Sequence, residues 1–170
     1  VKAEAALAAA VRRAYRFDTT VVVEQGVAAR EIECAVLGTD ADPRASVAGE
    51  IRPNAEFYSY EAKYLDPRGA ELLVPARIPA ALARRVRELS LLAFKTLGGH
   101  GLARVDFLLD RKTGRLWFNE VNTLPGFTRI SMYPKLWEAS GLSFPRLIDR
   151  LIRLALLRRR RLSRLSITRD

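Results

Sequence analysis

Two stretches joined by a short turn constrain the fold of this chain more than any other feature. Residues 101–110 read GLARVDFLLD, residues 116–128 read LWFNEVNTLPGFT, and the residues between them are polar or glycine. Side chains of a β-strand point alternately to opposite faces, so the alternation of apolar and polar residues predicts two strands. The short connection predicts that they pair as an antiparallel hairpin.

The hairpin predicts which polar side chains meet. If the chain turns about residue 113, Asp106 lies opposite Glu120, and Arg104 lies opposite Asn122 on the same face. Opposed residues have Cβ atoms about 4.5–5.5 Å apart, and two carboxylates that close repel one another unless a cation lies between them. Together with the Asn122 amide oxygen, these two carboxylates form the oxygen donor set that Mg²⁺ prefers. A Mg²⁺ ion held in this way is usually also coordinated by phosphate oxygens. The pattern therefore predicts a metal site and a nucleoside triphosphate ligand, against the alternative of a solvated hairpin with surface charges.

The rest of the chain predicts a mixture of helices and strands. Apolar residues at helical spacing predict helices over residues 3–16 and 79–97 and a last helix after Ser143. Strands are predicted over residues 19–24, 31–37 and 46–51. Residues 53–69 lack periodicity, and a long loop in a compact domain is usually a lid or a binding loop.

Three groups of residues carry a family resemblance. The first is VVVEQGV over 21–27 followed by REIECAVLG over 30–38, the second is FYSYEAKY over 57–64, and the third is the hairpin, which continues as SMYPKLWEASG over residues 131–141. In this order, the motifs resemble the C-terminal part of D-alanine–D-alanine ligases, members of the ATP-grasp superfamily. The resemblance extends over residues 1–156.

The resemblance implies an α+β fold, an ATP-grasp C-terminal domain with a mainly antiparallel sheet flanked by helices. It places residues 1–27 at the end of the central ATP-grasp subdomain and residues 28–156 in the C-terminal domain, including a mobile loop over 52–70. Residues 157–170 form a basic tail. No glycine-rich phosphate loop is recognisable, so the chain is expected to be the C-terminal catalytic half of a ligase without its N-terminal half.

The resemblance also implies nucleotide contacts. Glu24, Gln25 and Val27 match the hinge whose backbone recognises adenine, and Glu31 matches the acidic residue that hydrogen-bonds the ribose hydroxyls. Lys63, in the mobile loop, matches a lysine that places its charge on phosphate oxygens. The implied cofactors are ATP and two Mg²⁺ ions, or Mn²⁺ in their place.

Further residues match positions that act on the substrates. Arg104 is expected to bind the transferring phosphoryl group or a developing oxyanion. The backbone N–H of Gly126 is expected to approach the reacting carboxyl group, and Ser131 and Met132 to hold the carboxylate of the second substrate through a hydroxyl and a backbone N–H. Tyr64 follows Lys63, and this pair goes with relatives that form a dipeptide rather than an ester.

The implied reaction joins two D-alanines. ATP phosphorylates the carboxylate of the first, the amine of the second attacks the acyl phosphate, and phosphate leaves. The work of the protein is to position the reactants and to neutralise charge. The product serves peptidoglycan synthesis for the bacterial cell wall, so a cytoplasmic location is expected.

Composition limits the remaining possibilities. The single cysteine, Cys34, excludes an intramolecular disulfide, and there is no apolar run of the ~18 residues that a membrane span needs. The net charge of +10 is concentrated partly in residues 158–161, and a basic tail can bind nucleic acid or an anionic membrane surface. The interpretation favoured here is a solvated helix end, with neither nucleic acid nor membrane as a partner; a homodimer stays open.

Three alternatives accompany this interpretation. One is a D-alanine–D-lactate ligase or another ATP-grasp carboxylate–amine ligase, against which Tyr64 argues. The second is a non-catalytic nucleotide-binding fragment completed by a partner chain, suggested by the lack of a phosphate loop. The third is a basic nucleic-acid-binding module, which salt-dependent binding to DNA or RNA would reveal.

Overall fold

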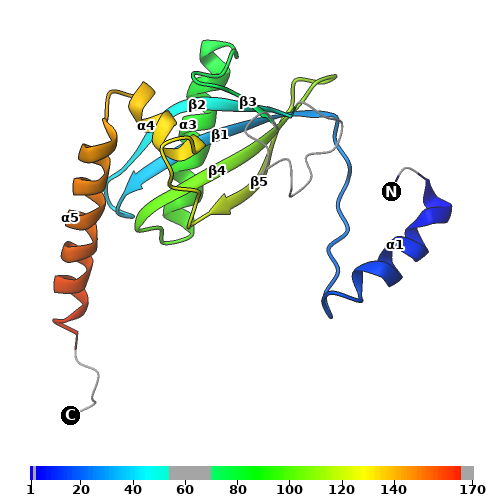
Figure 1. The fold of residues 1–170 in the computed structure, drawn as a ribbon, viewed down its shortest axis with the longest axis horizontal. Helices are drawn as coiled ribbons and strands as arrows, with labels where there is room; N and C mark the ends of the chain where they lie inside the picture. Colours follow the sequence, from blue (N-terminus) through cyan, green and yellow to red (C-terminus); the bar gives the residue numbers. More distant parts are fainter. Residues whose placement is uncertain (2, 54–69, 166–170) are drawn as a thin grey trace.

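A computed structural model describes residues 1, 3–53 and 70–165 of the chain, and its centre is a five-stranded antiparallel sheet (Figure 1). The strands lie in the order β3-β2-β1-β4-β5, and each pairs antiparallel with its neighbours. Their bounds are β1 Ala29–Gly38, β2 Pro43–Pro53, β3 Ala70–Leu73, β4 Gly101–Asp110 and β5 Leu116–Asn122. The expected α+β fold with a mainly antiparallel sheet is confirmed.

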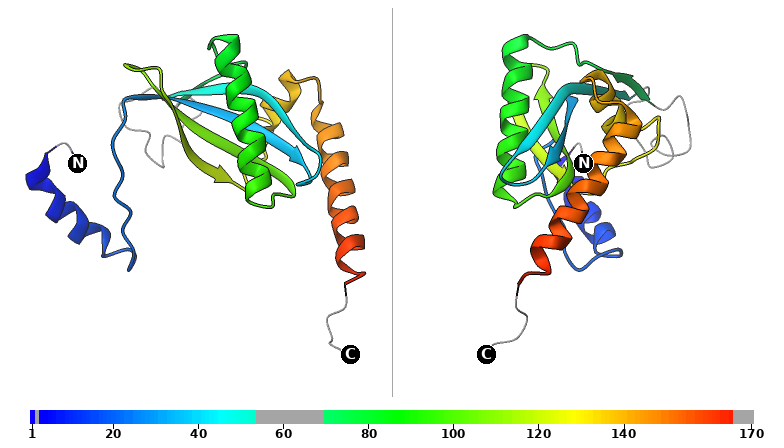
Figure 2. Two further views of the ribbon diagram at one scale, coloured as in Figure 1. Left: turned by 180° about the vertical axis from the view of Figure 1, so that it is seen from behind. Right: turned by 90° about the vertical axis from the view of Figure 1, so that its left-hand side faces the viewer.

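Helices cover both faces of the sheet (Figure 2). Helix α3 (Ala80–Thr96) lies across one face, and α4 (Met132–Ala139) lies against the other, followed by α5 (Phe144–Leu162). Strand β1 contributes to both layers because its side chains alternate: Cys34 and Val36 pack towards α3, whereas Ala35 and Leu37 pack towards α4. The sheet is therefore the middle of three layers, with an apolar core on each side.

Local sequence signals set the limits of the helices. Pro79 lies at the N-cap of α3, where a missing N–H costs nothing. The chain leaves α3 through Gly98, whose φ of 62° is in the left-handed region that glycine adopts without strain. Ser143 lies at the N-cap of α5, as predicted, although its side chain makes no capping hydrogen bond. Helix α5 continues to Leu162, so the expected boundary between residues 156 and 157 falls inside it.

The N-terminal segment lies apart from the sheet. A short 3₁₀ turn, η1 (Glu4–Ala6), leads into α1 (Leu7–Ala14), and an extended segment then joins β1 (Figures 1 and 2). The strand predicted over residues 19–24 does not form, and Val22 and Val23 are 75% and 69% exposed. A β-branched run forms a strand only where another strand pairs with it, so this prediction was wrong.

The expected mobile loop over residues 52–70 overlaps the sheet at both ends. Arg52 and Pro53 belong to β2, and Ala70 begins β3, which the sequence patterns did not predict. Lys63 and Tyr64 lie outside the described residues, so their expected roles stay predictions.

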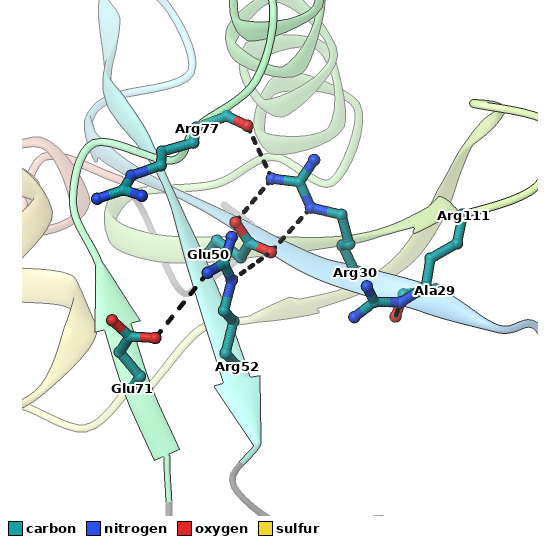
Figure 3. A network of polar contacts seen from close by, with 7 residues as sticks. All are labelled: Ala29, Arg30, Glu50, Arg52, Glu71, Arg77 and Arg111. Atoms are coloured by element: carbon teal, nitrogen blue, oxygen red, sulfur yellow. Dashed lines mark hydrogen bonds and ion pairs between the residues drawn. The ribbon is translucent and has the colours of Figure 1, made fainter.

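A buried carboxylate joins several elements on the α3 face. Glu50, on β2, is 1% exposed and accepts hydrogen bonds from Nε and Nη2 of Arg30, at 2.8 and 2.7 Å (Figure 3). Arg52 Nε lies 3.2 Å from the same carboxylate, and Arg30 Nη2 also donates to the backbone carbonyl of Arg77. These contacts, the hydrogen bond from Arg30 first, lower the pKa of Glu50. The network fixes β1 and β2 against the segment that leads into α3.

Candidate functional site

Three neighbouring strands bring charged side chains into one row on the α4 face of the sheet. Between β1 and β4, Glu33 lies opposite Asp106, and between β4 and β5, Asp106 lies opposite Glu120. One step along the same face, Arg104 lies opposite Asn122. Both opposed pairs predicted from the hairpin are confirmed, and Glu33 adds a third carboxylate to the row.

A bulge in β5 adjusts the register of the hairpin. Asp106 pairs with Glu120, but the next residue, Phe107, pairs with Phe118, so Asn119 is left without an opposed residue on β4. Strict alternation would place Phe118 and Glu120 on the same face. The bulge places them on opposite faces: Phe118 contacts the Phe107 ring edge-on beneath α3, while Glu120 stays beside Asp106.

Arg104 holds the centre of the row through paired contacts. Its Nε and Nη2 donate to Oδ1 and Oδ2 of Asp106, both at 2.8 Å, and Nε also lies 3.1 Å from Oε2 of Glu33. Burial by itself lowers the pKa of Arg104, but the Asp106 hydrogen bond and the charges of Glu33 and Glu120 raise it on balance. The guanidinium is therefore a fixed cation, held in plane by a carboxylate.

A small pocket opens over this row. It has a volume of about 230 Å³, and its charged and amide-bearing lining residues come from β1, β4 and β5: Glu31, Glu33, Arg104, Asp106, Asn119 and Glu120. The structure thus brings Glu31 together with three of the residues predicted from the hairpin. A concave site with converging polar groups of both signs is suited to a polar, charged ligand.

The residues after β5 lead from the pocket to α4. The Asn122 Oδ1 accepts a hydrogen bond from the Leu124 backbone N–H at 3.1 Å, which holds the turn that follows. Further on, Ser131 lies at the N-cap of α4, and its Oγ accepts a hydrogen bond from the Thr128 N–H at 3.1 Å. A Cβ added to Gly126 would lie 3.1 Å from that Oγ, so a larger residue at position 126 would require the Ser131 side chain to shift.

The remaining predicted residues lie at different depths. Met132 is buried, so its side chain belongs to the core, and its expected role needs only its backbone N–H. Glu24 and Gln25 are exposed and Val27 is half-buried, all in the extended segment before β1. The segment is not preceded by a strand, contrary to the prediction for residues 19–24.

Glu33 is a charged residue of the site that the sequence did not single out, and Glu50 is a further buried charge, on the other face of the sheet. Glu33 shares its face of β1 with Glu31, so period-two alternation alone was a signal for it. For Glu50 there was no such signal, because its partner Arg30 lies on another strand and 20 residues away in the chain. Pairing between strands, rather than the local sequence pattern, decides which charged side chains come together.

The oxygen atoms of Asp106, Glu120 and Asn122 fit a Mg²⁺ ion whose remaining ligands would be phosphate oxygens and waters. Within residues 1, 3–53 and 70–165, no cluster of three or more His, Cys, Asp or Glu side chains is arranged to enclose a metal. Asp106 and Glu120 supply two carboxylates, and Mg²⁺ is usually held by one or two carboxylates with waters and phosphate oxygens completing its shell. Each Asp106 oxygen accepts one hydrogen bond from Arg104 and retains a further lone pair for an ion.

Comparison with known proteins gives this geometry a family. The family model described as the D-ala D-ala ligase C-terminus matches residues 1–153. A D-alanine–D-alanine ligase A from Bradyrhizobium diazoefficiens is 58% identical over 162 residues, which are 94% of this chain and 43% of that protein. The chain thus spans about two fifths of the length of the curated relatives it matches.

Solved structures give the same result. The D-alanine–D-alanine ligase from Coxiella burnetii superposes with a TM-score of 0.83 at 38% identity, covering 96% of this chain and 42% of that one. The ligase from Bacillus anthracis complexed with ATP gives a TM-score of 0.76 at 32% identity, covering 95% and 51%. The chain therefore belongs to the D-alanine–D-alanine ligase family of ATP-grasp proteins, and the part of the family fold that it matches is the C-terminal part.

Proposed function

We propose that this chain supplies the C-terminal half of the active site of an ATP-dependent D-alanine–D-alanine ligase of peptidoglycan synthesis in the cytoplasm. In the proposed reaction, the carboxylate of one D-alanine takes the γ-phosphoryl group of ATP. The amine of a second D-alanine then attacks the acyl carbon, and phosphate leaves as the peptide bond forms. The family match over residues 1–153 supports the reaction class.

The row of charges is the observation that carries the proposal. Arg104, fixed by Asp106 and Glu33, presents a permanent positive charge at the pocket of about 230 Å³. Such a pre-positioned cation offsets the charge that develops on a transferring phosphoryl group, without having to reorganise during the reaction. Asp106, Glu120 and Asn122 would hold Mg²⁺, which supplies charge neutralisation on the phosphates when bound.

The other proposed contacts follow the chain away from this row. Glu31 would bind the ribose, and the backbone of Glu24, Gln25 and Val27 would lie against adenine. At the opposite end, the Gly126 N–H would face the reacting carboxyl group, with Ser131 and Met132 holding the second substrate. Because the N–H groups at the start of α4 lack helical partners, they favour a carboxylate there. We extend the proposal to Lys63 and Tyr64, as a phosphate contact and a selector of the amine nucleophile.

The first test is ATP binding by calorimetry, with and without Mg²⁺. We expect binding that requires Mg²⁺ and that is weakened at least about tenfold, or ~1.4 kcal/mol, in the Asp106→Asn/Glu120→Gln variant. A matched control, Glu88→Gln/Glu138→Gln, removes the same charge from exposed positions and should bind as the parent chain does. Thermal unfolding of all variants shows whether each is folded.

Two results would contradict the assignment. Binding that is unchanged in the Asp106→Asn/Glu120→Gln variant would remove the metal site from these residues. Absence of binding to a folded parent chain at millimolar ATP would show that the nucleotide site is not competent in this chain. The second result would favour the alternative of a fragment completed by a partner, which the coverage of about two fifths of the relatives' length also motivates.

A further inference from the structure

Helix α5 carries a stripe of arginines that the proposed reaction does not use. At 3.6 residues per turn, six exposed arginines fall on one side of the helix and of the turn that follows it: Arg146, Arg150, Arg153, Arg160, Arg161 and Arg164. We call this set the basic stripe. In Figure 1 the second half of α5 runs past the end of the sheet, and Arg158, on another side of the helix, lines a small pocket with the end of α3 and the start of β4. All six arginines of the basic stripe are exposed.

The start of the basic stripe borders a large groove. The groove has a volume of about 870 Å³, and Arg44 from β2 and Arg87 from α3 line it together with Arg146, Arg150 and Arg153. In the part of the chain that the structure describes, none of these five arginines forms an ion pair with a carboxylate. Asp149 is the one acidic residue in the lining. Like charges gathered in this way repel one another, and an anionic partner would relieve the repulsion.

An apolar stripe lies next to the basic stripe on the same helix. Ile148, Ile152 and Leu156 recur at intervals of four residues and are 37%, 54% and 52% exposed. A third side of α5 faces the core, where Leu147, Leu151 and Leu154 pack beside α4. A helix of this kind, with uncovered apolar side chains flanked by arginines, has the character of helices that lie in the plane of a membrane interface.

The charge and apolarity together narrow the class of partner. A second copy of α5 would bring one basic stripe against another, so self-association through this face is opposed by repulsion. Nucleic acid would satisfy the arginines but would leave Ile148, Ile152 and Leu156 in water, and no aromatic side chain lies among them for base stacking. An anionic lipid surface satisfies both features, since its headgroups bind arginines and its acyl region takes apolar side chains.

We infer that α5 docks this protein on an anionic lipid surface. The apolar stripe enters the headgroup boundary, and the basic stripe, with Arg44 and Arg87 at the groove, contacts the lipid phosphates. The inferred contact is peripheral. No helix of the described residues is long and apolar enough to cross a bilayer. This inference is independent of the ligase reaction, and it revises the expectation that no membrane is a partner.

Co-sedimentation with vesicles tests the inference. One set of vesicles contains phosphatidylcholine only, and the other contains phosphatidylcholine with phosphatidylglycerol. We expect binding to the anionic vesicles only, weakened at least about tenfold both in Arg150→Glu/Arg153→Glu and in Ile152→Ser/Leu156→Ser. Matched controls on the outer side of α3, Arg84→Glu/Lys95→Glu and Leu92→Ser/Leu97→Ser, change the same charge and apolarity at exposed positions and should bind like the parent.

The remaining outcomes would overturn the inference. Equal binding to both vesicles, or no binding to either, excludes recognition of anionic lipid. Unchanged binding by Ile152→Ser/Leu156→Ser excludes burial of the apolar stripe. Binding to a short DNA or RNA duplex without binding to vesicles would assign the basic stripe to nucleic acid instead. Circular dichroism of each variant establishes that α5 and the sheet are folded, so a loss of binding reports on the surface.

Discussion

At the scale of single residues, stability depends on the charge of Glu50. Its pKa is lowered in the fold, mainly by the hydrogen bond from Arg30, so its contribution is present above the unfolded pKa of about 4.3 and is lost as pH falls through the folded value. We expect Glu50→Gln to cost about 2 kcal/mol at neutral pH and the difference from the parent to shrink in acid, as urea unfolding across pH would measure. Glu71→Gln, which removes an exposed member of the same network, should cost under about 0.5 kcal/mol. If the difference in unfolding free energy between Glu50→Gln and the parent stayed constant with pH, the charge of Glu50 would not be what stabilises the fold.

At the scale of elements, Gly49 sets how closely α4 approaches β2. A Cβ at this position would lie 2.8 Å from Cδ2 of Leu136 and 2.9 Å from Sδ of Met132, both buried side chains of α4. Gly49→Ala should therefore displace α4 and cost about 1–3 kcal/mol of unfolding free energy. Gly26→Ala is the matched control, because nothing lies within 4 Å of the added atom. Equal unfolding midpoints in urea for the two variants would show that α4 has room to move.

At the scale of the whole molecule, the three layers form a unit to which the N-terminal segment adds little. Helix α1 has no buried residue, and the extended segment joins it to β1. Removing residues 1–17 should change the unfolding free energy of the remainder by less than about 0.5 kcal/mol, since no core contact is lost. The comparison is a pair of urea titrations on the full chain and the shortened chain. A larger loss would mean that the segment packs on the sheet in solution.

Local pattern predicted what depends on near neighbours in the chain. The hairpin was predictable because its turn and both strands lie within residues 101–122, and α3 was predictable from Pro79 and Gly98. Strand β3 was missed because four residues carry too little periodicity, and residues 19–24 were misassigned because no strand pairs with them. Two of the buried carboxylates, Glu33 and Glu50, acquire their partners only when distant strands meet.

The bulge at Asn119 has a consequence for how this segment tolerates change in length. Before Asn119, the even-numbered residue Phe118 faces α3, whereas after it the even-numbered residue Glu120 faces α4. The alternation of side chains therefore changes phase at the bulge. Deleting Asn119 would remove the bulge and make Phe118 and Glu120 neighbours, so regular alternation would keep Phe118 opposite Phe107 and Glu120 opposite Asp106. The strand is therefore expected to tolerate loss of this one residue better than any deletion that changes the register of Phe118 or Glu120 with β4.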